Sequence, residues 1–516
     1  MNPLRVWLPV SALLGAVAGT ASGQVISIKT VPIAQADQYV LFPSYNLGMG
    51  GVSIALPDTL LDLSVNPATG ARLTGARFFG SPVIYSVSQN AGGGGAVPIG
   101  AIARSGSWFG AFSLALQVVD PGRSFPPSIF FQPNGLARST APPLARNQSE
   151  GNASAFAMLG KVWPATGISL GGSASWTRLN AVDGVDMLYG TSQHVRQFGH
   201  SADYRLGFLK EWAGGQTLEA IALRTRFRMT HDVTFLDFFW DPGSQTINGR
   251  PRLEQNLDHT DTWGLHLAYQ RPLRELGWRI GWMVTGNRMF HSEIPNFEVV
   301  DAGIKNVPWD PGNSYAYNFG VGVSRTSGPV RVGIDAIYEP IWSHTWGEAE
   351  IPIPTRLGDT IPVGGMTVEN KFQFSNALFR MGVGRELPLR APGNAIGLQL
   401  GLMVRANHYW LAQYDHVQAA GRNHEERWME WTPTWGWSLR FPEFEIRYHG
   451  RVTNGTQRPG AVPGGGCGDC FRTLEAPANL LPTPISPLNM GSVSVVTHQI
   501  SISLPLGRPA TPGGAR

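Results

Sequence analysis

Strict alternation of polar and apolar residues most constrains how this chain of 516 residues folds. In residues 443–453 every second side chain is polar, and the positions between them hold Phe444 and Ile446. Residues 330–340 and 395–408 repeat the pattern. A helix, with a period of about 3.6 residues, would mix the two sets of side chains. The pattern therefore predicts β-strands with one apolar face and one polar or glycine-rich face.

The connections between these strands alternate between short and long. Short turns are predicted at residues 164–167, 213–216, 274–277, 327–329 and 441–442. Long polar loops are predicted at residues 121–151, 181–199, 231–257, 292–314, 344–368, 413–426 and 455–490. Antiparallel strands with short turns at one end and long loops at the other are typical of outer-membrane barrels. This count gives about 16 strands, or 14 if two segments are not spans.

A soluble β-sandwich or propeller would also alternate. The membrane barrel is favoured because Trp278, Trp282 and Trp431 fall on apolar faces, where interfacial aromatic girdles lie. Only 15% of the residues are charged, and the 40 basic and 36 acidic residues are spread without the basic stripe that nucleic-acid binding requires. The predicted fold is all-β, a transmembrane antiparallel β-barrel of 14 to 16 strands. Residues 371–386 keep no single phase, which predicts a bulge or a wrong boundary there.

The first residues are typical of a secretory signal peptide. Arg5 is followed by an apolar stretch and then by the small residues Ala21, Ser22 and Gly23. Residues 1–23 are therefore predicted to be removed, with a retained anchor as the alternative. No later apolar stretch approaches the ~20 residues that a membrane helix needs. Any later membrane residence must come from strands.

A compact motif without alternation precedes the first strand, expected at about Ala76. It reads Ser-Tyr-Asn-Leu-Gly-Met-Gly-Gly-Val over residues 44–52, and continues with Pro57-Asp58 and Asn66-Pro67-Ala68. This run resembles the entry of the long-chain fatty acid transporter (FadL) family of outer-membrane proteins. It is also similar to the related PorV-type barrels of the type 9 secretion system.

The resemblance implies an N-terminal extension and hatch over residues 24–75, inside the lumen of a barrel formed by residues 76–504, with a tail at 505–516. Glycine supplies the backbone freedom that such a hatch needs, and the asparagine of the second motif caps local backbone. An ordinary turn at a helix start is the alternative. The implied hatch residues are Gly48, Gly50, Gly51, Asn66, Pro67 and Ala68.

Residues 24–43 depart from the family pattern, because typical members begin the hatch almost immediately after cleavage. Two places are open for this extra segment, the periplasm and the barrel lumen. The last expected strand also ends at Leu504 and not at the chain end. These departures argue against fatty acids as the cargo, and they leave the prediction of a barrel unchanged.

A row of arginines is the first candidate ligand site. Arg224, Arg226 and Arg228 share one face of a strand, opposite an apolar face that contains Phe227 and Met229. If the apolar face meets lipid, the three guanidinium groups point into the lumen and can pair with an anionic head group. The alternative is a structural row paired with acids such as Glu430, as polar barrel interiors often hold.

Aromatic clusters in the long loops are the second candidate ligand site. One lies in the second external loop, at Phe125, Ile129, Phe130 and Phe131. The other lies in the fourth, at Phe235, Leu236, Phe238, Phe239 and Trp240. Exposed apolar loop surfaces suit the capture of apolar solutes, and loop packing on the barrel mouth is the alternative.

Cys467 and Cys470 lie in the last long loop, which strand parity places outside the cell. A local disulfide is expected in an oxidising compartment. Metal binding would need further ligands, and a redox motif would need a βαβ context.

The sequence contains no GxSxG, HExxH or GxxxxGK[ST] motif, so no enzyme, cofactor or metal site is predicted. The loop residues His424, Glu425 and Glu426 are interpreted as solvated neighbours.

These patterns predict an outer-membrane channel for passive uptake of hydrophobic or amphipathic, fatty-acid-like molecules, as the family resemblance implies. Its predicted partners are outer-membrane lipid and an apolar ligand. The alternative is a PorV-like barrel without transport, acting with a protein partner in secretion or surface-protein attachment.

Removal of residues 235–240 is expected to lower the uptake of apolar solutes, because it deletes the capture surface and leaves the membrane strands intact. Uptake by cells that carry the full chain or the deletion variant measures this, with heat-dependent mobility on gels as the check of folding. Unchanged uptake would remove the capture role.

Overall fold

The computed structural model describes residues 25, 26, 28–30, 34, 42–120, 130–132, 135–137, 150–183, 194–241, 243, 246–273, 277–293, 296–300, 303–307, 311–459 and 490–506. The signal segment, Phe125, Ile129, Cys467 and Cys470 lie outside these residues. None of the helices described is long and apolar enough to cross a membrane.

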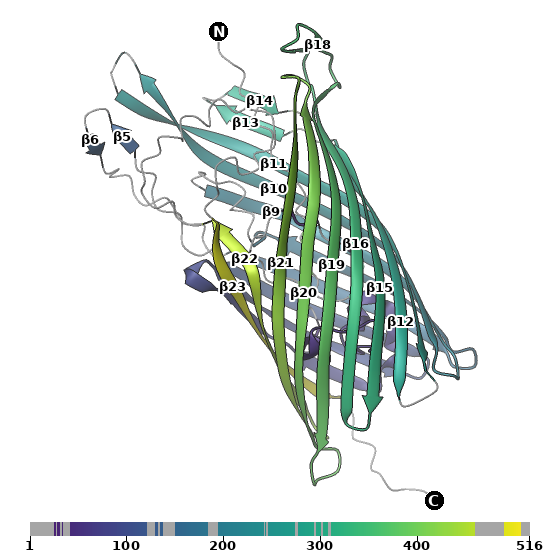
Figure 1. Cartoon of the computed structure of the whole chain (residues 1–516). Helices are drawn as coiled ribbons and strands as arrows, with labels where there is room; N and C mark the ends of the chain where they lie inside the picture. The colour runs from purple at the N-terminus through teal and green to yellow at the C-terminus, as the bar shows by residue number, and fades with distance from the viewer. Residues whose placement is uncertain are drawn as a thin grey trace, which may run out of the picture.

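A closed antiparallel ring of strands is the framework of the molecule (Figure 1). Its strands, in chain order, are β1 Ala76–Gly80, β2 Val83–Val87, β3 Gly93–Ser105, β4 Trp108–Asp120, β7 Glu150–Trp163, β8 Ile168–Leu179, β9 His194–Glu211, β10 Thr217–Asp241, β11 Thr246–Pro272, β12 Trp278–His291, β15 Gly312–Ser327, β16 Val330–Glu348, β19 Met366–Pro388, β20 Ala395–Asp415, β21 Ala420–Arg440, β22 Glu445–Pro459 and β23 Met490–Pro505. Each pairs with its neighbours in this order, and β1 and β2 together occupy one position between β3 and β23. The ring therefore has 16 positions and no free edge.

Smaller strand pairs lie outside the ring. β13 (Asn296–Val300) and β14 (Gly303–Val307) form a hairpin, and β13 pairs with the far part of β11. β5 (Phe130–Gln132) pairs with β6 (Gly135–Ala137), and β17 (Ile353–Pro354) pairs with β18 (Thr360–Ile361). All of them belong to the long-loop end, which is at the top of Figure 1.

The outer face of the ring is apolar. On β4 the residues Phe112, Leu114 and Leu116 are exposed, whereas the residues between them are buried. The tryptophans expected on apolar faces, Trp278, Trp282 and Trp431, are also exposed. Lipid offers no hydrogen-bond partners to the backbone, so an apolar band on a closed ring is the form in which strands tolerate hydrocarbon. The predicted antiparallel barrel is confirmed, and its 16 strand positions agree with the higher of the two predicted numbers, 14 and 16.

The predicted short turns are present, since β7 leads into β8, β9 into β10, β11 into β12, β15 into β16 and β21 into β22 within a few residues. The loop predicted at residues 231–257 is wrong for most of its length. Residues 231–241 and 246–257 continue β10 and β11 as a paired hairpin, which projects to the upper left in Figure 1. Above the apolar band neither face needs to be hydrophobic, so the alternation that marks a strand is lost there.

The bulge predicted within residues 371–386 is also wrong. β19 keeps one register with β20 across this stretch, and one set of side chains stays buried throughout, including Phe372, Leu378 and Arg380. The phase was hard to read because this inward face mixes apolar, charged and glycine residues. It does so because other parts of the chain pack against it inside the lumen.

A compact stretch at residues 42–73, called here the inner segment, packs against the inward faces of the strands. It contains the helices η1 (Leu47–Met49), α1 (Asp62–Val65) and η2 (Pro67–Arg72). Glycines on the wall leave room for its backbone. A Cβ atom placed on Gly171 of β8 would lie 2.6 Å from the Pro67 carbonyl oxygen, and one placed on Gly333 of β16 would lie 2.5 Å from Val52 Cγ1. The inner segment is therefore enclosed by the ring, near the short turns.

The neighbouring residues Gly171 and Gly172 offer a matched test of this close packing. Gly171→Ala is expected to push the inner segment off the wall at a cost of ~1–3 kcal/mol, because the new methyl group overlaps its backbone. Gly172→Ala meets nothing closer than 3.9 Å and serves as the control. Conductance in planar bilayers is expected to rise for the first variant only; equal conductance of the two variants contradicts the packing argument.

Candidate functional site

The inner segment is organised by one carboxylate, that of Asp58, which is 2% exposed. Its Oδ2 accepts hydrogen bonds from Ser44 Oγ at 2.5 Å, from Tyr45 N at 2.6 Å and from Asn46 N at 3.0 Å. Its Oδ1 accepts hydrogen bonds from the backbone N–H groups of residues 60 and 61, both at 3.1 Å. Charge-assisted hydrogen bonds are the strong ones, and five of them close this stretch into a compact loop. The acidic element of the sequence motif is thus the centre of the local fold.

The glycine cluster of the motif makes a tight turn against the wall. Gly50 and Gly51 both have left-handed backbones, with φ of 71° and 70°. Gly50 N donates to Thr434 Oγ1 at 2.9 Å. A Cβ atom on Gly48 would lie 2.6 Å from Gln399 Oε1, so this position permits only glycine without a shift of the wall. The motif combines required backbone angles with a close approach to β20 and β21.

The Asn66-Pro67-Ala68 motif begins η2. Asn66 Oδ1 accepts a hydrogen bond from Ala68 N at 3.0 Å, Pro67 occupies the first turn, and Ala68 is fully buried. The Asn66 amide also donates to Glu219 Oε2 of β10 at 2.9 Å. The motif therefore caps its own helix and ties it to the wall.

Buried polar groups hold the inner segment on opposite sides of the ring. On β16, Asp335 Oδ2 accepts from Ser53 N at 2.8 Å and from Ile54 N at 3.2 Å. Gln399 Nε2 of β20 donates to the carbonyl oxygen of residue 45 at 2.7 Å. On the other side, Arg205 Nη1 of β9 donates to the carbonyl oxygens of residues 64 and 65 at 2.9 and 3.2 Å. Further hydrogen bonds to the wall involve Gly48, Asn66 and Arg72, so the inner segment is held to the ring at many points.

Asp62 adds an electrostatic constraint within the inner segment. Burial raises the pKa of its carboxyl group well above the ordinary value, and the nearby carboxylates of Asp58 and Glu219 raise it further, against the opposing effect of Arg72. Asp62 Oδ2 accepts a hydrogen bond from Asp58 N at 2.8 Å. The segment thus concentrates acidic groups in a buried space, where one of them stays protonated more readily.

A second lumen feature, called here the upper apolar wall, faces inward nearer the long-loop end. It consists of the buried residues Met289, Ala316, Ile341, Phe372, Phe374, Tyr409 and Leu411. The ring centroids of Phe374 and Tyr409 are 5.1 Å apart. Aromatic pairs at this distance bind each other and other apolar groups well. A polar interior is usual for barrels of this kind, so this surface is unexpected.

The N-terminal extension covers the upper apolar wall. Ile26 and Ile28 are 3% and 4% exposed and belong to the same cluster. Ile26 N donates to Asn287 Oδ1 at 2.9 Å, and Lys29 forms an ion pair with Glu430. Of the two places left open for residues 24–43, the described part of this segment, around Ile26 and Ile28, lies in the lumen.

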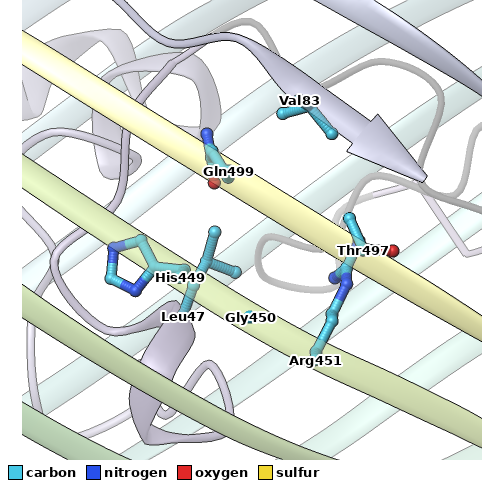
Figure 2. Close-up of a pocket in the computed structure, with 7 residues that line it drawn as sticks. All are labelled: Leu47, Val83, His449, Gly450, Arg451, Thr497 and Gln499. Atoms are coloured by element: carbon cyan, nitrogen blue, oxygen red, sulfur yellow. The ribbon is translucent and has the colours of Figure 1, made fainter.

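A small pocket lies between the inner segment and the wall (Figure 2). It is lined by Leu47, Val83, His449, Gly450, Arg451, Thr497 and Gln499. Figure 2 shows Leu47, from the inner segment, beside His449 of β22 and Gln499 of β23. His449 Nε2 is 3.0 Å from the carbonyl oxygen of Ser44. The pocket joins the inner segment to the place where β1 and β2 meet β23.

The arginine row lies on the opposite face from the one expected. Leu223, Phe227 and Met229 are buried toward the lumen, whereas the side chain of Arg226 is 51% exposed on the outer face. The expectation assumed that the apolar face meets lipid. At this height the apolar face instead packs inside the barrel with Leu179, Val182, Val195 and Val233. The lumen site built from Arg224, Arg226 and Arg228 is therefore not formed.

The backbone of Phe235, Phe238, Phe239 and Trp240 belongs to the β10–β11 hairpin beyond the ring. Their role as a capture surface stays a prediction. Within the described part of the chain, no three His, Cys, Asp or Glu side chains gather as a metal site.

Sequence reasoning missed the upper apolar wall and Asp335. Phe372 and Phe374 fall in the stretch whose alternation kept no single phase, and that irregularity was the available signal. When both faces of a strand carry apolar residues, the sequence pattern alone cannot show which face meets the lipid and which meets the lumen. Asp335 looked like an ordinary polar residue of a strand, because its partners, Ser53 and Ile54, are remote in sequence.

No protein-family model matches the sequence, and no curated protein is similar to it in sequence. The structure matches solved outer-membrane barrels over nearly its whole length. The toluene transporter TodX of Pseudomonas putida has a TM-score of 0.40 and 11% identity, with 92% of this chain and 100% of that chain covered. A FadL homologue of Pseudomonas aeruginosa has a TM-score of 0.44 and 9% identity, with coverage of 90% and 99%.

The toluene transporter TbuX of Ralstonia pickettii has a TM-score of 0.37 and 11% identity, with coverage of 90% and 97%. Scores and identities this low carry no argument about the ligand.

Asp58→Asn is expected to loosen the inner segment, because the neutral amide removes the charge and one acceptor from a group that five donors share. We expect a loss of ~1–3 kcal/mol for this local fold. The reporter is Leu47→Cys, whose thiol should react faster with a water-soluble maleimide when Asp58→Asn is also present than when Asp58 is retained. Asp359→Asn, at an exposed carboxylate beside β18, is the control. Equal labelling rates in all three backgrounds would refute the role of Asp58.

Proposed function

We propose that this protein is an outer-membrane channel through which hydrophobic or amphipathic small molecules pass by diffusion. In this proposal the inner segment is the hatch that the sequence motif implies. The apolar outer band and the aromatic residues at its borders support residence in a membrane. The position of the long connections at one end of the ring supports the orientation with that end outside the cell.

The upper apolar wall is the observation that carries the proposal. A pore for polar solutes gains nothing from phenylalanine and leucine on its inner face, since exposed apolar surface in a water-filled lumen is costly. Ile26 and Ile28 now cover this surface, as an apolar ligand would. Burial of a side chain as large as isoleucine contributes roughly 1.5–3 kcal/mol of hydrophobic free energy. A small apolar molecule that buries a similar area can therefore replace Ile26 and Ile28 at little net cost in free energy.

The proposed route continues from the upper apolar wall toward the small pocket beside Leu47. The pocket borders the interruption between β1 and β2, where Ser81 Oγ is hydrogen-bonded to Ser501 and Gln499 and two backbone hydrogen bonds also hold the wall. Ser81 N donates to the Pro98 carbonyl at 2.9 Å, and Ile500 N donates to the Pro82 carbonyl at 3.0 Å. Exit requires movement of the hatch or opening of the wall beside the pocket.

Phe374→Ala and Phe379→Ala test this route as a matched pair. The two residues lie on the same strand, and their side chains point to opposite sides of the barrel wall. Phe374 is 1% exposed in the lumen cluster, and Phe379 is 39% exposed on the outer face. We expect Phe374→Ala to weaken binding of the apolar fluorophore N-phenylnaphthylamine by about 10-fold, which corresponds to the loss of ~1.4 kcal/mol. Phe379→Ala should bind as the unaltered chain does.

Fluorescence titration in detergent gives the affinities, and uptake of the same fluorophore into proteoliposomes gives the transport rate. The proposal is wrong if the two variants bind and transport alike. It is also wrong if the purified chain binds no apolar probe and instead retains a protein partner, as the secretion-associated alternative requires.

A further inference from the structure

We propose that the outer face of β8 to β12, at the border between the apolar band and the long-loop end, binds the phosphate groups of a phosphorylated glycolipid in the outer leaflet. The proposal needs the barrel to lie in an outer membrane. It does not depend on what crosses the lumen.

Strand register places the cationic residues together. Arg178 of β8 is opposite His200 of β9, and His200 is opposite Arg228 of β10. Arg226 lies one position lower on the same face, opposite Ala202 of β9 and Asp261 of β11. Adjacent strands are about 4.8 Å apart, so these side chains start within about 10 Å of one another. They form what is called here the outer basic cluster, with Arg224 and Arg288 below them.

The outer basic cluster carries more positive than negative charge. Asp261 is its acidic member, and it pairs with Arg228 at 2.6 Å and with Arg226 at 3.3 Å. Arg178, Arg224 and Arg288 form no ion pair with any residue that the structure describes. One carboxylate therefore faces five guanidinium groups.

Aromatic rings hold the lower guanidinium groups flat against the barrel. Arg224 lies over the ring of Trp263 at 4.6 Å, and Arg288 lies over the ring of Tyr315 at 5.9 Å. Stacking of this kind leaves the edge of the guanidinium group available for hydrogen bonds. The Arg224 Nε–H group is buried and has no hydrogen-bond partner among the described residues. The described residues therefore supply no acceptor for this donor.

The height of the cluster matches the lipid head groups. On β11 the outward side chains run from Arg271 through Leu267 and Leu265 to Trp263 and Asp261. This ten-residue interval equals the roughly 9–11 residues with which a tilted strand crosses a bilayer. Arg271, over the ring of Trp282, marks the lower border, so the outer basic cluster lies at the upper border.

The opposite wall shows that this charge is not a general property of the border. There Lys371 pairs with Glu369 at 2.7 Å, and Arg427 lies 3.9 Å from Glu425. The cations on β19 and β21 are thus compensated by acids of the same strands. Only the β8–β12 wall combines several arginines with a single carboxylate among the residues described at this height.

Phosphate is the acceptor that this arrangement fits, because guanidinium groups bind it with paired charge-assisted hydrogen bonds. Several arginines spread over three strands suit a head group with more than one phosphate. Above them β10 and β11 continue as a tall paired hairpin, which provides a wall beside the head group. A phosphorylated glycolipid of lipopolysaccharide type combines these features, whereas phosphatidylglycerol and phosphatidylethanolamine have one phosphate and a small head group.

The test uses the purified full chain in dodecyl maltoside and diphosphorylated lipid A as the probe, with native mass spectrometry as the readout. Arg178→Gln/Arg226→Gln removes two cations and keeps the Arg228–Asp261 pair. We expect it to weaken binding about 10-fold or more, since charge-assisted hydrogen bonds to phosphate are lost. Lys371→Gln/Arg427→Gln, on the opposite wall, should bind as the unaltered chain does. Heat-dependent gel mobility checks folding; if the first double variant does not fold, Arg226→Gln alone replaces it.

Three further probes separate the sources of phosphate. Dephosphorylated lipid A and phosphatidylglycerol should both bind more weakly than diphosphorylated lipid A, and excess inorganic phosphate should not displace the lipid. Equal binding by the first double variant and the unaltered chain would overturn the proposal. So would equal binding of dephosphorylated lipid A or phosphatidylglycerol, or full displacement by inorganic phosphate.

Discussion

The hydrogen-bonding needs of the backbone in lipid govern the whole structure. A strand can face hydrocarbon only if both its edges are paired, and the ring meets this need when the short strands β1 and β2 close it against β23. Closure creates a lumen, and a lumen of 16 strands would leak unless it were filled. The inner segment, the N-terminal extension and the glycines of the wall are all consequences of that one requirement.

Filling the lumen sets two opposing demands on the inner segment. It must hold its own shape, which the five donors on Asp58 provide, and in the proposed channel it must also let solutes pass. Its attachment to the wall combines many polar contacts, such as those of Asp335 and Gln399, with backbone packing against glycine. An apolar cluster also joins Phe42 and Leu63 of the segment to Phe109 and Phe156 of the wall. The inner segment is thus a stable unit that both polar and apolar contacts hold to the ring.

The two faces of the barrel wall have different chemistry at the same height. On β10, Phe227 and Met229 present an apolar surface to the lumen, and outside, Arg226 and Arg228 present charge at the border of the apolar band. This reverses the simple rule of apolar outside and polar inside. The rule holds within the hydrocarbon, where Leu265 and Leu267 face outward, and it ends where the lipid head groups begin.

The sequence by itself determined the strand class and the short turns, because both depend on neighbours within a few residues. The closed barrel was inferred from the expected difference between turns and loops, although two of the expected long loops, at residues 231–257 and 413–426, are mostly paired strand. Only the tertiary structure decided which face of β10 meets the lumen, that β19 has no bulge, and that Ile26 and Ile28 lie on an apolar inner wall. A period of two residues divides the side chains of a strand between two faces, but it does not show which face meets the lipid and which meets the lumen. The assignment depends on what packs against each face, and those partners are tens to hundreds of residues away in the chain.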